Sequence, residues 1–91
     1  MGVLDGKAAI VTGSARGIGR ATAELLAQNG AKVLINDLDG DVAEQTSGEI
    51  KGETVAFAGD LTKEGVADKL VSTAVEAFGQ LDIVVNNAGY T

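Results

Sequence analysis

The 91-residue sequence contains no cysteine, histidine, proline or tryptophan. Without cysteine the chain can form no disulfide, thiolate nucleophile or cysteine-ligated metal site. Without histidine it has no imidazole base and no easy zinc ligand, so we expect no metal site. Only 7 basic residues accompany 13 acidic ones, which gives a formal net charge of −6. This balance argues against binding nucleic acid or an anionic membrane through bulk charge.

Long apolar runs are also missing. Residues 1–6 include Asp5 and hold no apolar stretch of signal-peptide length. Even the longest apolar runs, such as residues 83–85, are far too short to cross a membrane. The hydrophobic content of 45% is nevertheless that of a globular protein. We therefore expect one small domain without a membrane segment, located in the cytoplasm.

Four short apolar runs alternate with helical patterns along the chain. The runs cover residues 8–11, 33–35, 54–58 and 81–85. The first is continuous rather than alternating, as is typical of a strand covered on both faces. Strands joined by helices pair in parallel through right-handed crossovers. We therefore predict an α/β fold with a Rossmann-type doubly wound parallel sheet, in the order β-α-β-α-β-α-β and with strand order 3-2-1-4.

Helical periodicity predicts three helices between these strands. The inner face of the first is expected to carry the residues that repeat at helical spacing, namely Ile18, Ala21, Thr22, Leu25 and Leu26. The second helix is expected over about residues 39–50. The third follows Thr62, whose hydroxyl can cap it, and ends at Gly79.

The fourth strand is expected at an edge of the sheet. In a doubly wound sheet it pairs with the first strand, on the side opposite the second. Its apolar residues 83–85 then face no further strand, and such an edge invites pairing with another chain. We therefore expect residues 1–91 to be the N-terminal, dinucleotide-binding part of a single larger Rossmann domain, in a protein that forms homo-oligomers.

A glycine-rich turn joins the first predicted strand to the first helix. Residues 12–19 read Thr-Gly-Ser-Ala-Arg-Gly-Ile-Gly. Gly13 allows a sharp exit from the strand, Gly17 leaves room for a pyrophosphate, and Gly19 lets the helix pack close to the sheet. Backbone amides and the helix dipole then favour phosphate. An ordinary glycine-rich turn is the alternative, whereas the P-loop of a GTPase-like switch is not indicated, because no Gly-Lys-Ser/Thr follows.

Side chains near this turn bear on the choice of cofactor. Ser14 and Arg16 can add hydrogen bonds to the phosphates. Asp37 closes the second predicted strand, where a carboxylate can accept both ribose hydroxyls of an adenosine. Its charge would repel a 2′-phosphate, whereas Arg16 would attract one. Because the Asp37 carboxylate would occupy the 2′ position directly, we predict NAD, with NADP second. An exposed turn aspartate is the alternative.

Two more segments follow the third and fourth predicted strands. Asp60 can face the exocyclic amine of adenine and the Leu61 amide can meet the ring, although a helix-start acid is the alternative. Residues 86–89 read Asn-Asn-Ala-Gly, and small residues there suggest close approach to a ligand or an Asn-Gly type of turn. The candidate cofactor-binding residues are Gly13, Ser14, Ala15, Arg16, Gly17, Ile18, Gly19, Asp37, Leu38, Asp60, Leu61, Asn87, Ala88 and Gly89.

In this order the motifs resemble the short-chain dehydrogenase/reductase family over the whole chain. They are Thr-Gly-x-x-x-Gly-x-Gly at residues 12–19, the acids Asp37 and Asp60, and Asn-Asn-Ala-Gly at residues 86–89. Residues 5–20 and 82–89 are similar to the 3-oxoacyl-[acyl-carrier-protein] reductase-like branch. The resemblance implies NAD(P)-dependent hydride transfer between a nicotinamide and a small carbonyl or secondary alcohol, with reduction of a 3-oxoacyl thioester as one candidate.

The resemblance also implies a catalytic tyrosine with a neighbouring lysine and a serine. This sequence has one tyrosine, Tyr90, followed by a single residue, so it holds no Tyr-x-x-x-Lys. No catalytic residue is therefore assigned, and we expect the 91-residue chain alone to be inactive. The alternative is a truncated or engineered half-fold that binds a nucleotide without turnover.

Overall fold

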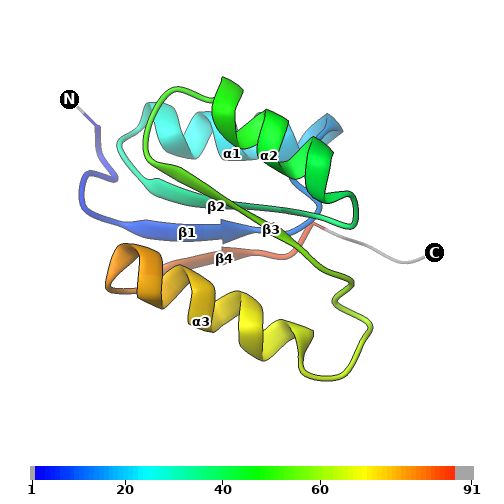
Figure 1. Cartoon of the computed structure of the whole chain (residues 1–91). Coiled ribbons are helices and arrows are strands. Elements are labelled where there is room, and N and C mark those ends of the chain that lie inside the picture. Colours follow the sequence, from blue (N-terminus) through cyan, green and yellow to red (C-terminus); the bar gives the residue numbers. More distant parts are fainter. Residues whose placement is uncertain (1, 88–91) are drawn as a thin grey trace.

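The computed structural model describes residues 2–87, which form a four-stranded parallel sheet with helices on both faces (Figure 1). The strand order is β3-β2-β1-β4, so the predicted fold and topology are confirmed. The elements are β1 (Ala8–Val11), α1 (Gly17–Gln28), β2 (Lys32–Asp37), α2 (Gly40–Glu49), β3 (Thr54–Ala58), α3 (Val66–Phe78) and β4 (Ile83–Val85).

The central strands β1 and β2 are buried because both of their faces are covered. Successive side chains point to opposite faces of a strand, so each strand contributes to two cores. Val11 and Ile35 pack with alanines of α1 and α2 in one core. Ile10 and Leu34 pack with Leu70, Ala74 and Phe78 of α3 in the other. The apolar runs of these strands are continuous for this reason.

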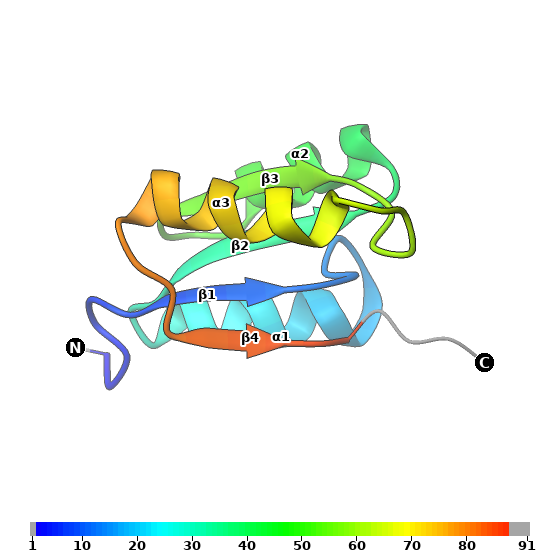
Figure 2. The same cartoon turned by 90° about the horizontal axis from the view of Figure 1, so that it is seen from below.

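Helices α1 and α2 cover one face of the sheet and α3 covers the other (Figures 1 and 2). The predicted inner face of α1 is wrong for two of its large residues, because Ile18 is 79% exposed and Leu25 is 60% exposed, whereas Leu26 packs against the core as predicted. The buried residues of α1 are instead small, namely Gly19, Ala23 and Ala27. Small side chains let a helix backbone approach the sheet, and a pattern search that favours large apolar residues does not find such a face.

The start of α3 also differs from the prediction. Its N-cap is Gly65 in the left-handed region, and the helix begins at Val66. Thr62 does not cap it, because the Thr62 amide and hydroxyl both donate to the Asp60 carboxylate. An aspartate two residues away is a near acceptor that forms a local turn, and it holds Thr62 outside the helix.

Strand β4 pairs with β1 in parallel register. The amide of Ala8 donates to the Asp82 carboxylate at 2.9 Å, which fixes the beginning of the β1–β4 pair. Val84 is 59% exposed, and within residues 2–87 no strand lies on the other side of β4, as predicted. No helix in this described part of the chain is long and apolar enough to cross a membrane.

Candidate functional site

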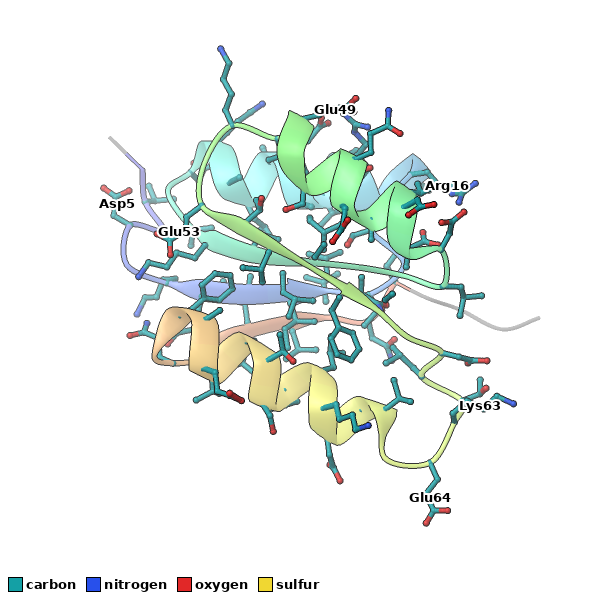
Figure 3. All side chains as sticks on the ribbon, in the orientation of Figure 1. Asp5, Arg16, Glu49, Glu53, Lys63 and Glu64 are labelled. Atoms are coloured by element: carbon teal, nitrogen blue, oxygen red, sulfur yellow. The ribbon has the colours of Figure 1, made fainter. Side chains whose placement is uncertain are left out.

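The candidate site lies at the edge of the sheet where the parallel strands end. The loop after β1, Asp37 at the end of β2, and Asn87 after β4 all lie at this edge. Figure 3 shows Arg16 at the same edge and Asp5 and Glu53 at the opposite one. Ligands of doubly wound sheets bind at the carboxyl ends of the strands, near the point where the strand order reverses. Here that point is β1, between β2 and β4.

Gly17 opens α1 in a backbone conformation that favours glycine. Its φ of +64° lies in the left-handed region, which side chains other than glycine rarely adopt. A Cβ atom at this position would meet nothing within 4 Å among the described residues. The loop therefore has open space beside its turn into the helix, as the predicted pyrophosphate position requires.

Gly19 is required for close packing rather than for its backbone angles. A Cβ atom there would overlap the carbonyl oxygen of Gly13 and would lie 2.6 Å from Asn87 Nδ2. The first turn of α1 therefore rests directly on the glycine-rich loop and on the chain after β4. This confirms the predicted close approach.

The first amides of α1 have the arrangement of an anion site. The helical ladder begins with Arg20, whose amide donates to the Arg16 carbonyl at 3.3 Å. The amides before it have no acceptor inside the helix. Within the described chain, the N-cap residue Arg16 makes no side-chain cap, and the first turn carries no acidic residue. These amides can therefore donate to a phosphate, which the helix dipole also favours.

Two side chains anchor the loop from outside. Thr46 lies on the buried face of α2, and its hydroxyl donates to the Ala15 carbonyl at 2.6 Å. From the other side, Asn87 Nδ2 donates to the Gly13 carbonyl at 3.2 Å, and the Asn87 amide donates to the Thr12 hydroxyl at 2.9 Å. Asn87 therefore braces the ends of β1 and β4. The predicted positions Ala88 and Gly89 lie outside the described residues.

Asp37 ends β2 beside the loop, as predicted. Its Oδ1 accepts the Asp39 amide at 3.1 Å and lies 3.9 Å from a guanidinium nitrogen of Arg16. The Arg16 side chain is 67% exposed, whereas that of Asp37 is 15% exposed. The two groups predicted to bear on cofactor choice are therefore neighbours, with an exposed guanidinium beside a carboxylate that is mostly buried. Ser14, by contrast, is fully buried and faces the protein.

Asp60 lies after β3 in a turn. Its Oδ1 accepts the Thr62 hydroxyl at 2.6 Å and the Thr62 amide at 2.9 Å. These bonds hold the pKa of the Asp60 carboxyl below its usual value. Leu61 is half-buried against the core beneath α3. The contact of either residue with adenine stays a prediction.

An apolar groove of about 330 Å³ runs between α3 and the β1–β4 pair. The sequence did not indicate it, because it exists only where three elements meet. Thr12 and Asn86 line the groove where the strands end, so it adjoins the candidate site. The other lining residues are Ile10, Leu61, Ala67, Leu70, Val71 and Val84.

Asn36 and Thr46 are the polar residues that the sequence analysis missed. Both are 2% exposed and both bond to the glycine-rich loop. Asn36 directly follows the apolar run of residues 33–35 within β2, and this position is the one signal that could have marked it. For Thr46, nothing in the sequence showed which backbone atom its hydroxyl would reach.

The family model for short chain dehydrogenase matches residues 7–91. Tropinone reductase-like 2 of Erythroxylum coca is 45% identical over 94% of this chain and 31% of its own length. Sorbitol dehydrogenase of Cereibacter sphaeroides is 46% identical over 93% of this chain and 33% of its own length. The chain therefore spans about a third of the length of these curated relatives.

Two solved structures of dehydrogenases or reductases also match nearly all of this chain and about a third of their own length. A 7α-hydroxysteroid dehydrogenase in complex with NADH and 7-oxo glycochenodeoxycholic acid matches with a TM-score of 0.92 and 40% identity, over 96% of this chain and 35% of that one. A 3-ketoacyl-(acyl-carrier-protein) reductase of Brucella melitensis in complex with NADH matches with a TM-score of 0.90 and 45% identity, over 94% and 35%.

Proposed function

Because the chain belongs to the short-chain dehydrogenase family, we propose that it holds the adenosine and pyrophosphate half of an NAD site. The complete protein would be an oxidoreductase that transfers hydride between the nicotinamide and a carbonyl or secondary alcohol. The observation that carries the proposal is the start of α1. There, among the described residues, the first amides have no acceptor within the helix, the space beside Gly17 is open and the first turn holds no acidic residue. That combination suits an anion such as a diphosphate.

Each candidate residue would contact a different part of the dinucleotide. The amides of Gly17, Ile18 and Gly19 would donate to the diphosphate oxygens, and the exposed Arg16 guanidinium would add charge from the solvent side. Asp37 would accept the adenosine ribose hydroxyls. Ile18 and Leu38 are 79% and 72% exposed, and they would lose water when the dinucleotide covers them.

The nicotinamide of such a cofactor would supply the hydride chemistry, and this part of the chain would anchor the adenosine and the diphosphate. The apolar groove beside Thr12 and Asn86 adjoins the site. Reduction of a 3-oxoacyl thioester is one candidate reaction, supported by the similarity to the Brucella melitensis reductase. Tropinone-, sorbitol- and steroid-related relatives are equally similar, so the substrate class we propose is the carbonyl or secondary alcohol in general.

We expect the protein to bind NAD more tightly than NADP. Asp37 is fixed at the end of β2, whereas Arg16 is largely exposed and can turn toward solvent, so the repulsion of a 2′-phosphate should prevail. Titration with both cofactors tests this. Asp37→Ala should weaken NAD binding and narrow the preference for NAD over NADP. The matched control is Asp41→Ala, because Asp41 is an exposed acid of α2. A wild-type preference for NADP would contradict the role given to Asp37.

A nucleotide-binding half-fold without turnover is the second candidate; residues 1–91 hold no Tyr-x-x-x-Lys. We expect the 91-residue chain mixed with NADH and a panel of ketones to show no turnover above buffer, because no group donates the proton. Saturable oxidation of NADH by this chain alone would contradict that expectation. Cytoplasmic location and homo-oligomer formation are further predictions, which fractionation and light scattering of the full-length protein would test.

A further inference from the structure

We propose that Asn36 is the positioning residue of the dinucleotide site: its buried amide sets the glycine-rich loop, the end of β2 and the end of β3 at fixed distances from one another. The inference rests on the proposed function. Asn36 is 2% exposed and stands next to Asp37 in β2. A buried amide in an apolar strand must be fully hydrogen-bonded, or its desolvation destabilises the fold.

The Asn36 amide is satisfied by three backbone groups from two other segments. Its Oδ1 accepts the Gly13 amide at 3.2 Å. Its Nδ2 donates to the Phe57 carbonyl at 3.1 Å and to the Gly59 carbonyl at 3.4 Å. A short side chain that accepts once and donates twice is found only in asparagine. An ionised aspartate of the same shape would place a negative oxygen against the two carbonyls.

The backbone of Asn36 bonds to the same loop. The Ser14 amide donates to the Asn36 carbonyl at 2.7 Å, and the Asn36 amide donates to the Ser14 hydroxyl at 2.9 Å. The amides of Gly13 and Ser14 are therefore committed to β2, and they face away from the position proposed for the phosphates. The donors left for a diphosphate are those at the start of α1, and Asn36 determines which ones they are.

This arrangement links the three segments that would contact the cofactor. Gly13 begins the phosphate loop, Asp37 follows Asn36 directly, and Gly59 precedes Asp60. A ligand that spans from ribose to diphosphate binds well only if these groups are already spaced correctly. Asn36 never needs to touch the cofactor to affect its affinity, so its role is one of positioning.

The test compares NADH and ADP-ribose binding by the full-length wild type, Asn36→Leu and Asn36→Asp. Thr54→Val is the matched control. Thr54 also bridges elements through its side chain, contacting the hydroxyl and the carbonyl of Ser47, but at the opposite end of β3. We expect Asn36→Leu to weaken the binding of both NADH and ADP-ribose by on the order of tenfold. Thr54→Val should lower the melting temperature and leave the dissociation constants unchanged.

Asn36→Asp keeps the shape of the side chain and provides a second readout if Asn36→Leu fails to fold. At neutral pH its carboxylate can accept from Gly13 but cannot donate to either carbonyl. Protonation restores one donor, so the gap in NADH affinity between wild type and Asn36→Asp should narrow as pH falls. Asp37 follows this position directly in β2 and Asp60 follows Gly59, so both carboxyl groups flank the partners of Asn36 and both are present in the wild type and in Asn36→Asp.

The outcomes separate this proposal from the function on which it rests. If wild type binds NADH and both Asn36 variants bind equally well despite lower melting temperatures, Asn36 only stabilises the fold and the positioning role is wrong. If the affinity gap of Asn36→Asp does not change with pH, the donor role of the amide is wrong. If the wild type itself fails to bind NADH or ADP-ribose, the proposed function falls, and the positioning role falls with it.

Discussion

Helices α1 and α2 begin at the same edge of the sheet, but their first turns are built in opposite ways. The N-cap of α2 is Asp39, whose Oδ1 accepts the amides of Asp41 and Val42 at 3.0 and 3.3 Å. Asp41 adds a second negative charge in the first turn. The N-cap of α1 is Arg16, which makes no side-chain cap, and its first turn has no acid among the described residues.

This difference separates a helix start whose amides are capped by a side chain from one whose amides are left for the proposed phosphate. An aspartate at the N-cap occupies the amides and balances the positive end of the helix dipole. Among the described residues no side chain performs either task at α1, and the N-cap residue, Arg16, is itself a cation. A loop with such an end is stabilised when a phosphate supplies the missing acceptor. The comparison therefore supports the phosphate position proposed at the start of α1.

The largest effect on stability and NADH affinity is expected from replacing Gly19 of α1 by alanine, with the same replacement of Gly48 in α2 as the contrast. Gly19→Ala has no room against the Gly13 carbonyl and the Asn87 amide, so it should cost about 1–3 kcal/mol of stability. NADH affinity should fall at least about tenfold. Gly48→Ala in α2 meets nothing within 4 Å and should stabilise the protein by about 0.5–1 kcal/mol with unchanged affinity. Thermal unfolding and NADH titration measure both, and a neutral Gly19→Ala would refute the packing argument.

Giving α1 the cap that α2 already has should separate stability from binding. Arg16 has extended backbone, with φ −154° and ψ 167°, which an N-cap aspartate can adopt. Arg16→Asp should therefore raise stability by about 1 kcal/mol and weaken NADH binding by about tenfold. Arg16→Ala removes the cation without adding a cap, so it should weaken binding less. Unchanged affinity in Arg16→Asp would mean that the phosphates bind elsewhere.

Removing the cap of α2 gives the converse. Asp39→Ala leaves the amides of Asp41 and Val42 without their side-chain acceptor and should cost about 1 kcal/mol in urea unfolding. NADH affinity should change little, because α2 offers no phosphate site in this account. A large loss of affinity with intact stability would show that the two helix starts share the ligand.

The smallest effect concerns the ion pair that joins the two helices. Gln45 and Arg20 donate to the Glu49 carboxylate and lower its pKa, and Arg20 reaches it from α1 at 2.9 Å. A carboxyl whose pKa is lower in the folded state stabilises the fold above its unfolded pKa, and this contribution is lost as pH falls through the folded value. Glu49→Gln should therefore destabilise slightly at neutral pH and not at all in acid. A difference that grows in acid would contradict the sign.

Much of the fold could be predicted from the sequence because strand order follows from the alternation of elements. Strands β1 and β3 have the predicted bounds, since glycine or polar residues limit each apolar run. The inner face of α1 could not be predicted, because Gly19, Ala23 and Ala27 carry little hydrophobic signal. Their burial depends on how closely the helix can approach the sheet, which is a tertiary property.

The candidate site was predictable in outline but not in its supports. Residue type and position at or after the end of a strand are enough to identify Gly17, Gly19 and Asp37. Asn36 and Thr46 do not, because their partners are backbone atoms more than twenty residues away, and these contacts exist only once the register of β1, β2 and β3 is set. The residue type of a threonine or asparagine is the same whether its side chain bonds to solvent or to a loop, so the sequence does not reveal the partner.

The most direct measurement is a titration of ¹⁵N-labelled protein with ADP-ribose, followed by amide chemical shifts. The account predicts saturable shifts at the amides of Gly17, Ile18 and Gly19, with those of Asp41 and Val42 nearly unchanged. Shifts confined to α2, or no saturable change at α1 in protein that remains folded, would contradict it.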